Sequence, residues 1–382
     1  MSGYREQPEP VTGLRGSRDA QLAVRIALAA TVEPEDKTML PRLRGLDPFT
    51  AWELVRGNEG GKFGRAVARA KQLRIDAIVA RTEETGARIV IPGDDEWPCR
   101  LGDLEHPPFC LWVAGQASLR EACERSISMV GARAATPYGT QVAGEIAYGL
   151  SNRGFTVVSG GAHGIDTASH RGTLAAGGCT IAAMACGIDI AYPAANAGLL
   201  QQIEQTGAII TELPPGFAPQ KQRFLSRNRL IAALTPGTLV VEAGLRSGSR
   251  STATAASRLG RLLAAVPGPV TSPASAGPHQ LIRDCGATLV TDVDDCAELF
   301  GTIGADLAEP KRAAPTLFDA LEESDRRLLD AMPVMRGTTP EKLAVSAGLS
   351  AREVTRGLAA LHAARLVERI ESGWRRTPDP AT

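Results

Sequence analysis

The stretch TLVVEAGLRSGSRSTATAASRLGR, residues 238–261, carries the strongest structural signal in this sequence. An apolar, β-branched run ends at Glu242, a loop of Gly, Ser and Arg follows, and an Ala-rich helix is predicted from about Thr252. A helix that begins just after a strand presents free backbone N–H groups and the positive end of its dipole, and both favour an anion. The stretch therefore predicts a phosphate site formed by Arg246, Ser247, Gly248, Ser249, Arg250 and Thr252.

Two upstream stretches repeat this strand–loop–helix pattern. In GFTVVSGGAHGIDTASHRG (154–172), a predicted strand is followed by Ser159, Gly160, Gly161 and His163. The spacing is close to the dinucleotide-binding fingerprint, but Ser159 stands where the first glycine of that fingerprint belongs. In ISMVGARAATPYGTQVAGEIAYGL (127–150), a strand is followed by Arg133 and by a proline suited to the first turn of a helix.

Between residues 127 and about 300, predicted strands and helices alternate. Strands are expected at 127–131, 155–159, 180–186, 208–211, 238–242, 262–266 and 287–291, with helices at 139–152, 166–176, 197–206, 224–234, 252–260 and 278–284. Apolar strands joined by crossover helices form a parallel sheet that is covered on both faces. This α/β pattern predicts a Rossmann-like core, and ligands bind such folds at the carboxyl ends of the strands.

The whole chain is predicted to have three folded parts. We expect a disordered tail (1–18), an N-terminal helical domain (19–85), the Rossmann-like domain (86–300), a linker (301–319) and a C-terminal winged-helix domain (320–378). Residues 40–55 resemble a SAM-like or helix-hairpin-helix segment, which is either a structural cap or a DNA contact. In the last domain, Ser350 and Glu353 form a capping box. Its third helix could contact DNA or protein.

The charge of the chain is balanced overall and uneven locally. The 382 residues contain 42 Lys and Arg and 42 Asp and Glu, so no global basicity indicates a nucleic-acid partner. Between residues 216 and 261, however, Glu242 is the one acidic residue among many cations. A confined polyanion site would look like this; the alternative is a set of solvated surface arginines. The cations are Lys221, Arg223, Arg227, Arg229, Arg246, Arg250, Arg258 and Arg261.

Several classes of protein lack their usual signals here. The seven cysteines form no CxxC pair and indicate neither a disulfide framework nor a zinc site, which fits a reducing cytoplasm. No apolar run is long enough to span a membrane. A Walker lysine motif, HExxH and a nucleophile elbow are also missing from the sequence. We therefore predict a cytoplasmic protein with no catalytic residues, metal or cofactor.

Motifs in fixed order point to a family. They are VGARAATPYG (130–139), SGGAHGIDTASH (159–170), GGCTIAAMACGIDIAYPAAN (177–196), FLSRNRLIAAL (224–234), EAGLRSGSRSTA (242–253), AVPGPV (265–270) and GPHQLIRDCGATLV (277–290). Over nearly the whole chain, the sequence resembles the DprA/Smf family of bacterial DNA-processing proteins. This resemblance implies sequence-independent binding of single-stranded DNA, loading of the recombinase RecA, displacement of single-strand binding protein, and a homodimer acting in competence, natural transformation or recombination.

The chemistry of a DNA strand fits the residues of these motifs. A polynucleotide needs cations and N–H donors along a groove and aromatic faces for its bases. Phe224 is either a stacking platform or a core anchor, and Asn228 is expected to hold its loop by local hydrogen bonds. The predicted DNA-binding residues are Arg133, Ser159, Gly160, Gly161, His163, Lys221, Phe224, Arg227, Asn228, Arg246, Ser247, Gly248, Ser249 and Thr252.

Three finer expectations follow from individual positions. Glu242 is expected to orient Arg227 or Arg229. We expect Arg227→Glu to weaken strand binding and to leave the fold intact. His163 stands where the family commonly has Arg, so one contact should be weaker and should depend on pH near neutrality.

Two enzyme readings compete with DNA binding. One is a nucleotide-processing enzyme that uses the same cleft, with Glu242 or Asp166 as the acid–base group. The other is an NAD-dependent oxidoreductase, which Ser159 disfavours. Affinity that rises with oligonucleotide length and falls with salt would indicate the polymer binder.

Overall fold

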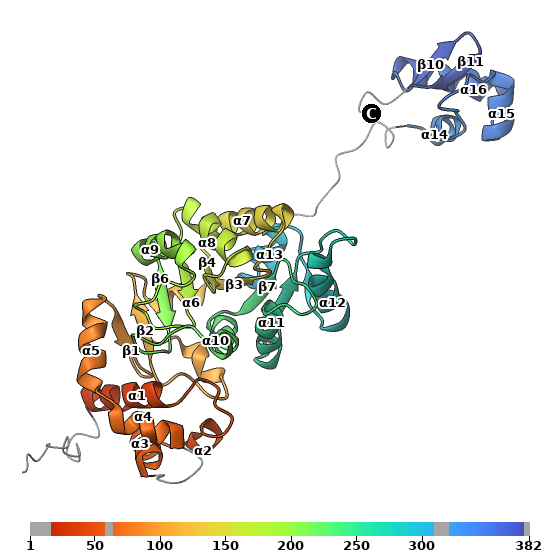
Figure 1. Ribbon diagram of the computed structural model, residues 1–382. Helices are drawn as coiled ribbons and strands as arrows, with labels where there is room; N and C mark the ends of the chain where they lie inside the picture. The colour runs from red at the N-terminus through yellow and green to blue at the C-terminus, as the bar shows by residue number, and fades with distance from the viewer. Residues whose placement is uncertain (1–16, 58–63, 309–320, 378–382) are drawn as a thin grey trace, which may run out of the picture. The chain divides into compact units, whose positions relative to one another are not determined.

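The computed structural model of the protein describes residues 17–57, 64–308 and 321–377. The chain divides into two compact units, Met1–Glu309 and Pro310–Thr382, and each is described by itself (Figure 1). Most of the predicted tail (1–18) and of the predicted linker (301–319) lies outside the described residues.

A nine-stranded sheet forms the centre of the first unit within the described residues. The strand order is β1-β2-β6-β5-β4-β3-β7-β8-β9, and the strands from β6 to β9 in this order are all parallel. The two strands β1 and β2 extend the sheet in antiparallel pairing beside β6. Their bounds are β1 Arg88–Val90, β2 Leu111–Ala114, β3 Ser126–Val130, β4 Thr156–Ser159, β5 Thr180–Ala183, β6 Ala208–Thr211, β7 Gly237–Val240, β8 Leu262–Ala265 and β9 Thr288–Leu289.

Alternating side chains of β3 enter two different cores. Ile127 and Met129 point to one face of the sheet and pack in a buried cluster with helices α7, α8 and α13, while α9 lies beside α8. Because successive strand residues point to opposite faces, Ser128 and Val130 face the other layer. The bounds of the helices on the first face are α7 Pro137–Asn152, α8 Ile165–Ala175, α9 Ala197–Thr206 and α13 Val293–Phe300.

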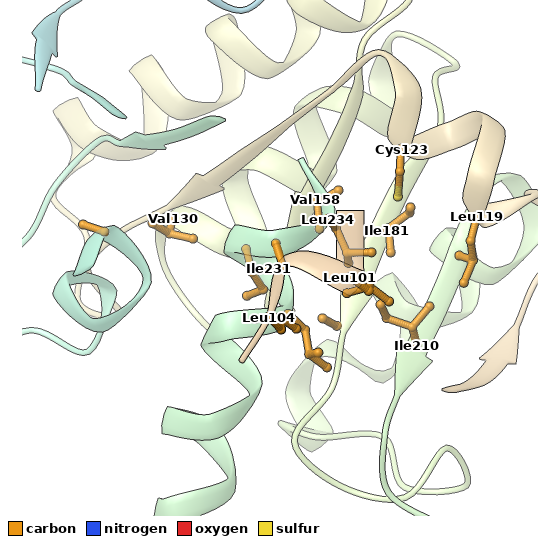
Figure 2. Close-up of a cluster of buried hydrophobic side chains, with 14 of the residues drawn as sticks. Leu101, Leu104, Leu119, Cys123, Val130, Val158, Ile181, Ile210, Ile231 and Leu234 are labelled. Atoms are coloured by element: carbon orange, nitrogen blue, oxygen red, sulfur yellow. The ribbon is translucent and has the colours of Figure 1, made fainter. Parts of the chain in front are cut away.

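The second face of the sheet carries the cluster drawn in Figure 2. There Val130, Val158 and Ile181 of the strands pack against Ile231 and Leu234 of α10. Each such fully buried aliphatic side chain contributes about 1.5–3 kcal/mol to folding. The helices of this layer are α6 Leu119–Glu124, α10 Lys221–Leu234, α11 Ser249–Arg258 and α12 Ala276–Asp284.

The N-terminal helices belong to the same compact unit as the sheet. Trp112 of β2 is fully buried, and its indole N–H donates to the Thr82 hydroxyl at 3.0 Å. Gly45, with φ of +75°, turns the chain between α2 and α3. The helices are α1 Arg18–Thr31, α2 Leu40–Leu43, α3 Pro48–Gly57, α4 Gly64–Gln72 and α5 Ile75–Glu84.

The predicted mixed α/β fold with a mainly parallel sheet is confirmed. Two helices begin one turn earlier than the sequence predicts: α10 starts at Lys221 and α11 at Ser249. Polar residues at these starts obscure the helical period, but they fit a first turn whose N–H groups remain free. The predicted strand at 287–291 is shorter and spans Thr288–Leu289.

The second unit contains three helices and a two-stranded hairpin within residues 321–377. The Ser350 hydroxyl accepts from the Glu353 N–H, and the Glu353 carboxylate accepts from the Ser350 N–H, so the predicted capping box is present. The hairpin turns before Gly373, which has φ of +123°. The elements are α14 Glu323–Asp330, α15 Pro340–Ala347, α16 Ala351–Ala363, β10 Val367–Ile370 and β11 Gly373–Arg376.

Candidate functional site

The strand order reverses at β3, and a cleft lies at that point. The chain runs from β3 to β4 on one side of the sheet, and β7 pairs on the other side of β3. Ligands of open α/β folds bind outside the carboxyl ends of the strands at such a reversal. A cleft of about 1100 Å³ lies here, lined by residues of the turns that follow β3, β4 and β7 and by one side of α10.

Ten of the fourteen predicted binding residues line this cleft, so the structure brings together positions that lie more than 100 residues apart. They are Arg133, Lys221, Phe224, Arg227, Asn228, Arg246, Ser247, Gly248, Ser249 and Thr252.

The four residues of the β4 turn lie elsewhere. Ser159 is fully buried, and its hydroxyl donates to the Met129 carbonyl at 2.6 Å. Gly160 and Gly161 are buried too, whereas His163 is exposed and lies outside the lining of the cleft. The turn instead contributes Ala162 and Asp166 to the wall.

Three cations of the cleft are available to a ligand. Arg133, Lys221 and Arg246 are exposed, and none of them forms an ion pair within the part of the chain that the structure describes. Asp166 is the single acidic residue of the lining. The cleft is therefore electropositive on a chain without net charge.

The prediction of a basic patch between residues 216 and 261 is partly wrong. Three of its arginines are neutralised by acidic residues that lie outside residues 216–261, so they do not present free charge to a ligand. The pairs are Arg223 with Glu33 at 2.8 Å, Arg229 with Glu212 at 2.5 Å, and Arg261 with Asp103 at 2.6 Å.

Arg227 is a structural member of the cleft wall. It is 4% exposed, and its Nη1 donates to the Gly160 carbonyl at 2.8 Å and to the Ala183 carbonyl. Burial lowers the pKa of Arg227 to about 10, so the guanidinium stays charged at neutral pH. A Cβ on Gly160 would lie 2.4 Å from Nη1, which explains the glycine. The expectation that Arg227→Glu leaves the fold intact is corrected, because a carboxylate here would face two carbonyl oxygens.

Glu242 does not orient an arginine, contrary to the sequence-based expectation. Its carboxylate accepts from the Thr136 N–H at 2.9 Å and from the Thr136 hydroxyl at 2.5 Å. Thr136 is the N-cap of α7, and its hydroxyl in turn accepts from the Gly139 N–H. Glu242 is 2% exposed and does not line the cleft, so the acid–base role considered for it is also corrected.

Asp166 holds the β4 turn from within. Its Oδ2 accepts from the Gly160 N–H at 3.1 Å and from the Ala162 N–H at 3.4 Å. Burial raises the pKa of Asp166, while the charge of Arg227 and the two backbone donors lower it.

The cleft wall carries a pair of aromatic residues, of which the sequence analysis predicted one. Phe224 is half-buried and its ring centroid lies 5.4 Å from that of Tyr192, while the Arg133 guanidinium lies 5.0 Å from the Phe224 ring. Tyr192 lines the cleft and is 38% exposed, but the sequence analysis did not single it out. The available signal in the sequence was an aromatic residue in the loop after the strand predicted at 180–186.

Asn228 links the two helices of the cleft. Its amide donates to the Gly248 carbonyl at 3.2 Å and to the Ser251 hydroxyl at 2.6 Å. These partners lie 20 and 23 residues away, so the hydrogen bonds are not local in the sequence as predicted; they hold the α11 turn against α10.

Two negative findings apply to the described residues. No group of His, Cys, Asp and Glu side chains among them is arranged to hold a metal ion. None of their helices has the length and apolar character needed to cross a membrane.

The sequence was compared with known families. The sequence model of the DNA recombination-mediator protein A family matches residues 88–301, more than half of the chain. The chain belongs to this family. The resemblance to DprA/Smf proteins is confirmed.

Relatives of this recombination-mediator family match across the chain. The putative DNA processing protein DprA of Mycobacterium tuberculosis is 42% identical over 361 residues, covering 91% of this chain and 92% of that protein. Protein Smf of Escherichia coli is 38% identical over 211 residues, covering 55% and 56% of the two chains. The X-ray structure of DNA processing protein A from Streptococcus pneumoniae aligns with a TM-score of 0.61 at 29% identity, covering 74% of this chain and 98% of that one.

Proposed function

We propose that this protein binds single-stranded DNA without sequence preference in the cleft at the carboxyl edge of its sheet. The observation that carries the proposal is a set of three exposed cations, Arg133, Lys221 and Arg246, which form no ion pair among the described residues. They line the cleft together with the half-buried Phe224 and the exposed Tyr192. Cations follow a phosphate backbone and aromatic faces stack bases irrespective of sequence.

Family membership extends the proposal to partners. We propose that the bound protein loads RecA, displaces single-strand binding protein and acts as a homodimer in the cytoplasm during transformation or recombination. We also propose that the second unit is a winged helix, which its three helices and hairpin support, and that residues 40–55 form a SAM-like or helix-hairpin-helix element.

We propose that the protein binds DNA in this cleft and does not catalyse a reaction there. The enzyme reading rested on Glu242 or Asp166 as an acid–base group. Glu242 is buried behind Thr136. Asp166 lines the cleft, but its Oδ2 is occupied by two backbone N–H donors of its own turn.

Fluorescence anisotropy of labelled oligothymidines tests the function. We expect affinity to rise with oligonucleotide length, to favour single over double strands, and to fall with salt at a slope of about −2 for three phosphate contacts. Binding that saturates with a mononucleotide and shows no dependence on length would contradict the proposal.

A further inference from the structure

Two loops at the carboxyl ends of neighbouring strands carry the aromatic pair of the cleft. The loop after β5 contains Tyr192, and the loop after β6 leads into α10, which contains Phe224. The two rings are in contact, with their centroids 5.4 Å apart. Phe224 is half-buried and has the Arg133 guanidinium 5.0 Å from its ring, whereas Tyr192 is exposed. Tyr192 is therefore the ring of the pair that offers more of its surface to a base.

The two loops are tied to each other by hydrogen bonds. Oδ1 of Asp189, in the loop after β5, accepts from the Gly216 N–H at 2.8 Å. The Gly187 N–H donates to the Phe217 carbonyl, also at 2.8 Å. The positions of the two loops therefore depend on each other.

An arginine of the N-terminal helices contacts both loops. Nη2 of Arg81, in α5, lies 2.7 Å from Oδ2 of Asp189. A Cβ on Gly216 would lie 2.9 Å from Nη1 of Arg81, so the same guanidinium also lies against the loop after β6. Neither Arg81 nor Asp189 lines the cleft. Apart from its long-range charge, Arg81 can therefore affect a bound strand only through these loops.

A second ion pair fastens the loop after β6 to the N-terminal helices. Arg223, in the first turn of α10, pairs with Glu33, which follows α1, at 2.8 Å. Nη1 of Arg223 donates to the Ala218 carbonyl at 2.7 Å, and the guanidinium lies 4.9 Å from the Phe217 ring. This loop is thus held from the N-terminal side at both of its ends, while the loop with Tyr192 is held through Asp189.

On the basis of the proposed function, we infer that Arg81 is a positioning residue for strand binding: through Asp189 it holds Tyr192 where a DNA base stacks on it. The N-terminal helices then take part in binding without contacting the ligand. Stacking requires a base, whereas the cations of the cleft require only phosphates. Loss of the Arg81–Asp189 pair should therefore weaken the contact with bases and leave the contact with the backbone.

Two DNA probes separate stacking from charge. One is labelled oligothymidine, and the other is a strand of equal length built of abasic sites, with the same number of phosphates. The parent should bind oligothymidine about tenfold more tightly or better, because the abasic strand offers nothing to stack. A parent that binds both strands equally would overturn the inference and leave phosphate binding intact. A parent that binds neither strand would overturn the proposed function, and the inference with it.

Two matched variants of the full-length protein test the role of Arg81. Arg81→Gln and Arg18→Gln each remove one cation from the N-terminal helices, and both arginines are 55% exposed and paired with an aspartate. The partner of Arg18 is Asp94, and neither residue of that pair lines the cleft. Arg81→Gln should lower the preference for oligothymidine over the abasic strand about threefold, whereas Arg18→Gln should keep the preference of the parent. Equal preferences in the two variants would overturn the inference.

A double variant tests whether Arg81 acts through Tyr192. In a Tyr192→Ala background, Arg81→Gln should not lower the preference further, because the ring that it positions is gone. A further loss of about threefold or more would show a different route and overturn the inference.

Two conservative variants distinguish positioning from a merely structural role. Asp189→Asn keeps an acceptor for the Gly216 N–H but loses the charge opposite Arg81, so it should reproduce the effect of Arg81→Gln. Arg81→Lys keeps the charge and should recover part of the preference. All thermal midpoints should stay close to that of the parent, since an exposed ion pair contributes little to stability. A lower midpoint of Arg81→Gln with an unchanged preference would show a purely structural role and contradict the inference.

Discussion

Helix α10 uses the same kind of residue for opposite purposes on its two sides. On one side, Arg223 and Arg229 meet Glu33 and Glu212 and are nearly buried. On the other side, Lys221 faces the cleft with no acidic partner among the described residues. A run of cations in a sequence therefore does not reveal which of them are free for a ligand and which hold the fold.

The residues on the two sides of α10 should also contribute differently to the free energy of unfolding. Side chains of Arg229 and Glu212 are each 8% exposed, and removing one partner leaves an uncompensated buried charge. Exposed cations such as Lys221 contribute about 0–1 kcal/mol to stability at most. Stability and strand binding should therefore respond to different residues of one helix.

The largest expected effect comes from breaking the buried pair. Arg229→Met should lower the free energy of unfolding by about 3–5 kcal/mol, because Glu212 loses its partner. Urea denaturation measures this. The double variant Arg229→Met/Glu212→Leu should recover most of the loss, since an apolar pair replaces an ionic one. A double variant as unstable as the single one would refute the buried-pair account.

The next largest effect is expected on oligothymidine binding, when the exposed cations of the cleft are removed. Replacing Arg133, Lys221 and Arg246 together with Ala should reduce the salt dependence of oligothymidine binding by about 2 in log–log slope and leave the urea midpoint nearly unchanged. Anisotropy titrations between low and moderate salt give the slope. If this triple variant unfolds as easily as Arg229→Met, the distinction between the two sides of α10 is lost.

Local sequence predicted the parallel core and not the charge pairing. Runs such as Val157–Val158 fix a buried strand, and the turns after such strands must meet at one edge. Arg223 and Glu33 lie 190 residues apart, so their contact depends on how the N-terminal helices pack on the sheet. The same holds for Glu242, which meets the N-cap Thr136 from 106 residues away. The pairing of β1 and β2 beside β6 is likewise a long-range contact without a local signature.

A smaller effect, on the stability of the protein at acidic pH, is expected from Glu33. Burial raises the pKa of Glu33, but the bonds from Arg223 and Arg69 outweigh it and hold that pKa below its ordinary value. The contribution of Glu33 to stability is therefore complete above about pH 4.3, the ordinary pKa of Glu, and is lost as the pH falls further.

Glu33→Gln measures this contribution. At pH 7 the variant should be less stable than the parent by about 1 kcal/mol, and the difference should shrink as the pH falls below 4. Urea midpoints of both proteins across this range give the result. A difference that grows on acidification would show that the sign is wrong.

The smallest expected effect is at His163, which is exposed beside the cleft turn and outside its lining. His163→Arg should strengthen strand binding at pH 8 by a few-fold at most, since one permanent cation is added near the phosphate path. Equal affinities of the parent and the variant would remove this residue from the interface.

The central claim, that the strand lies in the cleft, is tested most directly by reversing charge at the two ends of α11. Arg246 precedes the helix and lines the cleft, whereas Arg258 lies in its last turn, is exposed and is outside the lining. Both Arg→Glu changes alter the net charge equally. Arg246→Glu should weaken oligothymidine binding about tenfold or more, equivalent to about 1.4 kcal/mol, and Arg258→Glu should stay close to the parent. Equal losses in the two variants would contradict the claim.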